Sequence, residues 1–195
     1  MVATSGQAQH TPPGWAYNPS GWSQRLPLVG VALLGFGIAS ALALYQWGVL
    51  ATIWEPFFGE GSAVVLNSPV SRLLPIPDGA LGALGYLLDM VTGAIGGRAR
   101  WRTMPWIVLL FGLAVGPLGL ISVILVILQP IAFGAFCTLC LVSAFISINL
   151  IGPAMDETLA SLQYLRRERD AGRSVWRAFW GLGAGEPARE QEEAR

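Results

Sequence analysis

Four long apolar stretches, separated by short polar segments, dominate the pattern of hydrophobic and polar positions along the chain. A helix that crosses the hydrocarbon layer of a bilayer, about 30 Å thick, needs about 20 apolar residues. Because backbone amides inside a bilayer must be hydrogen-bonded within the protein, each stretch is predicted to be a helix. The pattern therefore predicts an all-α membrane protein, a four-transmembrane-helix bundle formed by residues 26–50, 79–95, 105–128 and 131–151.

The segments on either side of this membrane domain, residues 26–151, differ from it in composition. Residues 1–25 are rich in Gly, Pro and Ser and are predicted to form a disordered N-terminal tail. Residues 152–182 combine leucines at helical spacing with arginines, which indicates an amphipathic helix on the cytoplasmic membrane surface, interrupted near Gly172. Residues 183–195 are predicted to be a charged, solvated tail.

Glycines in two of the apolar stretches indicate where helices pack closely. They recur every third residue at Gly79, Gly82 and Gly85, and they lie four apart at Gly112 and Gly116. Since lipid supplies no hydrophobic drive for helix association, small residues at such spacing favour close approach of two helices.

The distribution of arginines predicts the orientation in the membrane. Arg98, Arg100 and Arg102 lie between the second and third stretches, and five more arginines lie in residues 166–177, whereas the 51–78 loop contains only Arg72. Cytoplasmic loops carry an excess of Lys and Arg. We therefore expect a multi-pass protein of the cell membrane, embedded in the lipid bilayer, with both termini cytoplasmic and the 51–78 loop outside.

The amino-acid composition limits the kinds of site and partner that we expect. Charged residues make up 12% of the chain, about half the usual share, and mean hydropathy is +0.54. Twelve arginines balance twelve acids, and this zero net charge gives no sign of a nucleic-acid partner. With a single histidine, His10, and two cysteines, a tetrahedral zinc site or a bis-histidine haem is not expected.

Cys137 and Cys140 form the one concentrated chemical signal in the sequence. Residues three apart share a helix face, and the rise per residue places both thiols roughly 9–14 Å below the outer edge of the fourth span. Such a pair interconverts between dithiol and disulfide, although free cysteines also serve as small buried hydrophobes. At this depth a lipid-soluble quinone is favoured over a water-soluble electron acceptor.

The predicted topology and the sequence FCTLCL in the fourth span resemble the vitamin K epoxide reductase family and its bacterial homologues. The resemblance covers residues 26–151. It includes the loop segment 62–68, which ends at Ser68, as well as Asp78 at the start of the second span and Tyr86 within it.

In that family a membrane dithiol reduces a quinone. The resemblance implies that Cys140 attacks the quinone, here menaquinone or ubiquinone, and that Cys137 exchanges disulfides. It also implies that Ser68, Asp78 and Tyr86 contribute to the quinone site. Asp78 would donate a hydrogen bond to a quinone carbonyl only in its protonated form.

The sequence departs from the family pattern at three positions. Trp54 and Ser62 stand where the loop cysteine pair is expected, so the internal disulfide shuttle of the family cannot operate. Ala144 replaces a tyrosine that commonly follows the second cysteine. We therefore expect a separate extracytoplasmic thioredoxin-fold protein to exchange directly with the Cys137–Cys140 pair.

Two other classes of function stay open from the sequence. Loss of the loop cysteines is compatible with a non-catalytic membrane subunit that binds a partner protein or lipid. Asp89, the one acid inside a span, is compatible with a transporter, because intramembrane carboxylates are often functional. An ion pair of Asp89 with Arg98 or Arg102 would give this residue a purely structural role.

Overall fold

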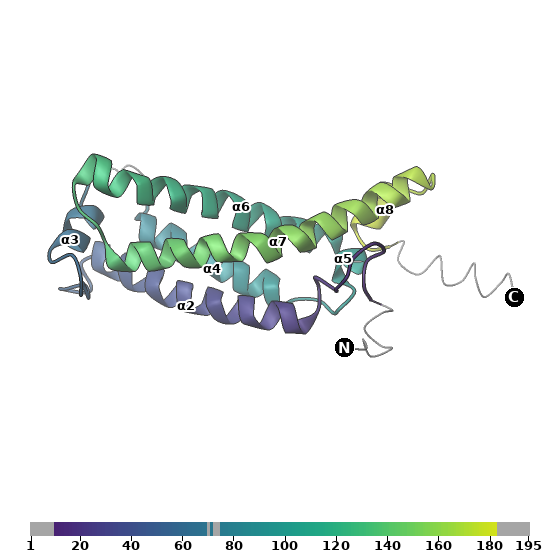
Figure 1. The fold of residues 1–195 in the computed structure, drawn as a ribbon, viewed down its shortest axis with the longest axis horizontal. Coiled ribbons are helices and arrows are strands. Elements are labelled where there is room, and N and C mark those ends of the chain that lie inside the picture. Colours follow the sequence, from purple (N-terminus) through teal and green to yellow (C-terminus); the bar gives the residue numbers. More distant parts are fainter. Residues whose placement is uncertain (1–9, 70, 72–74, 183–195) are drawn as a thin grey trace, which may run out of the picture.

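The computed structural model describes residues 10–69, 71 and 75–182, and this part of the chain contains helices but no strand. Four long helices run side by side (Figure 1). Short helices lie at the two ends: α3 (Gly61–Leu66) at what we call the loop end, and α5 (Arg100–Thr103) with α8 (Val175–Phe179) at the terminal end. The long helices are α2 (Trp22–Gln46), α4 (Asp78–Ala94), α6 (Pro105–Leu128) and α7 (Thr138–Asp170).

Within the described part of the chain, three segments are long and apolar enough to cross a membrane: α2, residues Pro105–Phe133 and α7. Only 28–33% of the residues in their most apolar windows are buried inside the protein. Apolar surface of this extent needs lipid around it, so the prediction of an all-helical membrane protein is confirmed. The remaining long helix, α4, has 17 residues and packs against α2 and α6.

Close helix contacts occur at three of the five glycines predicted to make them. A Cβ atom at Gly79 would lie 2.7 Å from the Ala43 nitrogen of α2. At Gly85 it would lie 2.5 Å from Leu118, and at Gly112 it would lie 2.1 Å from the Thr158 hydroxyl. At Gly116 the space is open, and Gly82 has only ordinary contact distances. Two of the three close contacts hold α4 between α2 and α6.

The fourth long helix begins and ends elsewhere than the sequence predicts. Residues Gln129–Phe133 form a π-helical turn that stops at Gly134, where φ is +61°, so α7 begins only at Thr138. It then continues unbroken to Asp170, so no helix end lies at residue 151. The interruption near Gly172 is present, since φ there is +71° and α8 follows.

Packing explains why residues 152–170 belong to α7 and do not form a separate surface helix. Ala160, Tyr164 and Leu165 are buried in one cluster with Trp101 of α5 and Ala178 of α8. Burial of this face against protein stabilises continuation of the helix beyond Pro153.

The N-terminal segment is ordered where the structure describes it, contrary to the predicted tail of residues 1–25. The indole of Trp101 donates to the His10 carbonyl oxygen at 2.9 Å, and that of Trp15 donates to Gln163 at 2.9 Å. Tyr17 donates to Asp156 at 2.5 Å. These contacts fasten residues 10–20 to the terminal end of the bundle, and residues 1–9 lie outside the described part.

A buried ionic network holds the terminal end together. Arg100 is fully buried and pairs with Glu157, which is 2% exposed and also accepts a hydrogen bond from Ser20. Arg100 and Arg25 additionally donate to backbone carbonyls at the end of α4, which have no partner inside the helix. The acceptors are Thr92 and Ile95 for Arg100, and Gly93, Ile95 and Gly96 for Arg25. Both cations thus compensate the negative end of the α4 dipole.

Asp89 takes no part in this network. No ion pair among the described residues includes it, so the expected pair with Arg98 or Arg102 is wrong. Asp89 is 5% exposed, and its Oδ1 has no hydrogen-bond partner in the described part of the chain. The buried arginines beside α4, Arg25 and Arg100, instead bind the carbonyls that end this helix.

Removing the carboxylate from the buried pair tests the network. Glu157→Ala leaves Arg100 buried without its counter-charge, which typically costs about 3–5 kcal/mol. We expect a clearly lower midpoint in SDS or thermal denaturation of the purified protein. Asp170→Ala, which removes a 58%-exposed partner of Arg166, is the control and should cost less than about 1 kcal/mol. Equal midpoints for the two variants would contradict the assigned role of the network.

Candidate active site

The two cysteines form a disulfide at the loop end, where α7 begins. Cys137 is the residue before the helix and Cys140 lies in its first turn, with their Cα atoms 5.2 Å apart. Both cysteines therefore lie at the start of α7 and not one to two turns inside it, because the π-helical turn delays the start of this helix. The Cys140 N–H donates to the Cys137 sulfur at 3.2 Å.

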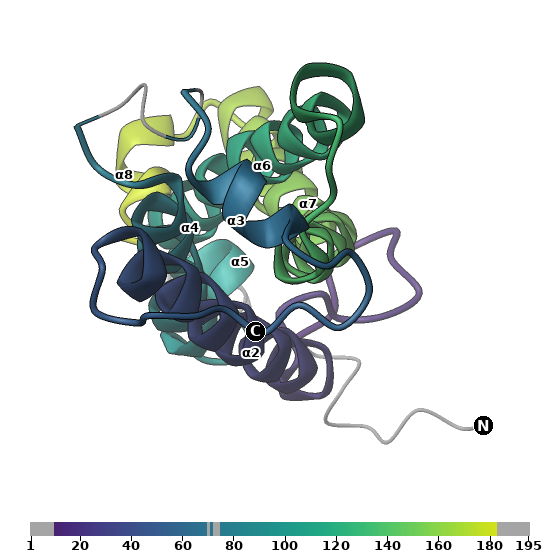
Figure 2. The ribbon, with the colours of Figure 1, turned by 90° about the vertical axis from the view of Figure 1, so that its left-hand side faces the viewer.

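Cys137 is completely buried beneath the loop helix α3. It packs with Leu42, Val65 and Leu66, and its N–H donates to Gln129 Oε1 at 2.9 Å. Viewed from the loop end, α3 lies across the end of the bundle (Figure 2). The approach is close, since a Cβ atom at Gly61 would lie 2.1 Å from the Phe136 carbonyl oxygen. A glycine at position 61 allows α3 to cover the disulfide.

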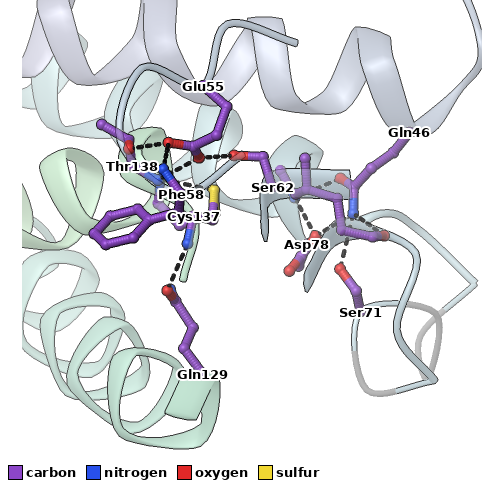
Figure 3. The surroundings of a disulfide bond; sticks show 12 residues. Gln46, Glu55, Phe58, Ser62, Ser71, Asp78, Gln129, Cys137 and Thr138 are labelled. Atoms are coloured by element: carbon purple, nitrogen blue, oxygen red, sulfur yellow. Dashed lines mark hydrogen bonds between the residues drawn. A yellow bond between two sulfur atoms is a disulfide. The ribbon is translucent and has the colours of Figure 1, made fainter. Parts of the chain in front are cut away.

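Glu55 attaches the loop to the first residue of α7 (Figure 3). Its carboxylate accepts hydrogen bonds from the Thr138 N–H at 2.8 Å and from the Thr138 hydroxyl. It also accepts one from the Ser62 hydroxyl of α3 and, more weakly, one from the Phe58 N–H at 3.2 Å. Burial by itself raises the pKa of Glu55, but the hydrogen bonds from Ser62 and Thr138 outweigh it, and the pKa falls to about 2.

A partly open cavity of about 90 Å³ lies on the other side of the disulfide. Cys140 lines it, whereas Cys137 does not. Most of the wall is apolar, and the polar side chains are few, as in typical ligand sites. Besides Cys140, the wall consists of Ala39, Leu42, Leu66, Asp78, Gly79, Gly82, Ser122, Leu125, Val126, Gln129, Ser143 and Ala144.

Asp78 is held in this wall by Gln46, the strongly polar residue near the end of α2. The Gln46 side-chain nitrogen donates to Asp78 Oδ1 at 2.5 Å and to the Ser71 hydroxyl at 2.8 Å (Figure 3). Its oxygen accepts from the Gly79 N–H at 3.1 Å, which also donates to Asp78 at 2.9 Å. In this geometry Asp78 is an acceptor that is fixed at the start of α4.

The structure brings together some of the residues that the sequence proposes for the site. Asp78 and Cys140 share the cavity, but Ser68 and Tyr86 are not among its lining residues. Ser68 accepts a hydrogen bond from the Ser71 N–H at 3.3 Å. Tyr86 is buried in the bundle core, where it donates to the Ser143 carbonyl at 2.6 Å. Tyr86 therefore reaches the cavity only through Ser143.

Sequence reasoning missed three residues that shape the site. Gln46 and Gln129 each carried a weak signal, as a polar residue within or directly after an apolar stretch. Glu55 carried none, because a single acid in a loop next to Trp54 is equally typical of a solvated surface. Its role depends on a contact across 83 positions of the chain.

These observations define the class of protein: a helical membrane protein with a CxxC disulfide between a covering loop and an apolar cavity. Residues 26–153 match the model of the vitamin K epoxide reductase family, which is more than half of the chain. The chain belongs to this family of membrane thiol–quinone oxidoreductases, as the resemblance implied. It matches none of the curated proteins and none of the solved structures with which it was compared.

The depressed pKa of Glu55 predicts a specific pH dependence. Since the folded-state pKa of about 2 lies below the ordinary 4.5, ionised Glu55 stabilises the folded protein fully above about pH 4.5. This contribution decreases as the pH falls through about 2. We expect the melting temperature of the wild type to exceed that of Glu55→Gln by a constant amount above pH 4.5 and to converge with it towards pH 2. A difference that grows on acidification would contradict the assigned hydrogen bonds.

Proposed function

We propose that the protein oxidises thiols of a partner protein through Cys137 and Cys140 and passes the electrons to a membrane quinone. The observation that carries this proposal is the position of the disulfide, with Cys140 facing an apolar cavity that also contains Asp78. Membership of the family supports the same chemistry. In this proposal α4 crosses the membrane as a fourth span.

The reaction balances in two halves. A partner dithiol attacks the Cys137–Cys140 bond through a mixed disulfide, leaving the partner oxidised and both cysteines as thiols. The two thiols then give two electrons and two protons to the quinone, which becomes the quinol, and their disulfide forms again. No metal is needed for either half.

Cys140 is the residue we assign to the quinone, because it lines the cavity and Cys137 does not. Gln129 and Ser143 carry hydrogen-bond donors in the wall for the ring oxygens, and Asp78 joins them only in its protonated form. Ser68 and Tyr86 act from outside this wall. A cavity that holds benzene measures about 150 Å³, which is larger than the 90 Å³ found here. A quinone ring therefore enters this partly open cavity fully only when its wall moves outward.

Cys137 is the residue we assign to exchange with the partner. It is buried beneath α3, and Ser62 at the expected position of a loop cysteine cannot form a disulfide. The partner thiol thus reaches Cys137 only after the loop is displaced. With both termini in the cytoplasm, as the arginine distribution favours, this partner is a thioredoxin-fold protein on the opposite side.

Quinone reduction by the purified protein tests the proposal. With a dithiol donor and a short-chain quinone, we expect Cys140→Ala to lower the rate of quinone reduction at least about 100-fold, because the reacting thiol is removed. Ser161→Ala is the control, since Ser161 is a fully buried side chain of the same helix that lies at the terminal end. Equal rates for wild type and Cys140→Ala would remove the catalytic proposal and leave a membrane subunit that binds a partner or lipid.

Trapping in intact cells tests the assigned order of the two cysteines. In Cys140→Ser, the Cys137 thiol attacks the disulfide of the oxidised partner, which is the reverse of the proposed exchange and releases one partner thiol. No Cys140 thiol is present to resolve the resulting mixed disulfide, so we expect it to accumulate and to be visible on non-reducing gels. Cys137→Ser should trap no such species. Accumulation only with Cys137→Ser would reverse the assignment.

A further inference from the structure

We propose that Glu55 is a positioning residue that disfavours the thiolate form of Cys137 once the disulfide has been reduced. This inference deepens the proposed function and rests on it, since it concerns how readily the reduced pair reacts. Glu55 touches neither sulfur. It acts through Thr138, the residue next to Cys137.

The geometry brings two acceptors to one helix terminus. The first residues of an α-helix have N–H groups without partners inside the helix. In α7, the Thr138 N–H donates to Glu55 at 2.8 Å, and the Cys140 N–H donates to the Cys137 sulfur at 3.2 Å. After reduction the sulfur that gains negative charge is therefore beside a terminus that already holds a carboxylate.

Electrostatics gives the direction of the effect. A helix N-terminus alone stabilises a thiolate and lowers the pKa of the thiol. Glu55 offsets this stabilisation, because its negative charge repels a second one and it occupies the Thr138 donors. No ion pair among the described residues neutralises it, since those found all lie at the terminal end.

The neighbouring charges reinforce Glu55 in the described part of the chain. The other charged groups at the loop end are Glu60, which precedes α3, and Asp78 in the cavity wall. Both are acids. Arg72 lies outside the described residues. The nearest described arginines in sequence, Arg25 and Arg98, precede and follow this region.

Ser62 connects this effect to the loop. At the position expected of a loop cysteine, its hydroxyl donates to Glu55 and so helps to hold the carboxylate at the start of α7. When the loop is displaced for a partner, Glu55 leaves together with α3, and the helix terminus is free to stabilise the thiolate. Partner binding and thiol reactivity are thereby coupled without a second disulfide.

The pH profile of alkylation tests this directly. In a Cys140→Ser background, where Cys137 is the only cysteine, the midpoint of its alkylation rate against pH reports the thiol pKa. We expect Glu55→Gln to move this midpoint to lower pH, with a roughly threefold to tenfold larger thiolate fraction at pH 7. Glu55→Asp, which keeps the charge, should stay close to the parent. Glu60→Gln, which removes a loop charge that does not accept from Thr138, should shift the midpoint less than Glu55→Gln does.

Ser62→Ala distinguishes the effect of a loosened loop on alkylation from the effect of a lost charge. This variant keeps the carboxylate, so we expect faster alkylation at every pH with a midpoint closer to the parent than that of Glu55→Gln. Glu55→Ser serves the same comparison if Glu55→Gln does not fold. The proposal would be overturned if Glu55→Gln and Glu55→Ser left the midpoint of alkylation unchanged. It would also be overturned if Ser62→Ala shifted this midpoint as much as Glu55→Gln does. Because no quinone is present, that result would leave the proposed quinone reduction untouched.

Discussion

The arrangement of the loop end depends on the hydrogen bonds between Glu55 and Thr138. They satisfy the first N–H of α7 and attach the loop that carries α3. Through this attachment Cys137 is covered, and the start of the helix turns Cys140 towards the cavity. The Glu55 carboxylate thus helps to keep Cys137 covered by the loop, while Cys140 faces the cavity.

The opposite end of α7 is held by a different interaction, the buried pair of Arg100 and Glu157. Since α7 is one continuous helix of 33 residues, Glu157 and Cys140 lie on the same element. Arg100 and Arg25 also bind the carbonyls that end α4, the helix whose first residue is Asp78. The same ionic network therefore anchors both helices that supply Asp78 and Cys140 to the cavity.

The sequence predicts those features that depend on local pattern. Apolar length predicts the long helices, glycine spacing predicts the contacts of Gly79 and Gly85, and the spacing of the cysteines predicts that they pair with each other. The hydrophobic and polar pattern does not predict features that depend on contacts between residues far apart in the sequence. Residues 152–170 stay in α7 because Ala160 and Leu165 pack against Trp101, and residues 10–20 are ordered through Trp15 and Tyr17. Glu55 is the clearest case, because a loop acid acquires its role only from the fold.

The redox state of the Cys137–Cys140 pair in membranes with and without quinone tests the central claim most directly. Rapid acid quenching followed by alkylation distinguishes the disulfide from the dithiol on gels. In membranes that contain quinone and a thiol donor, the account predicts a largely oxidised pair, and after extraction of the quinone it predicts a reduced pair that is oxidised again when quinone is restored. A pair whose redox state is the same with and without quinone would contradict it.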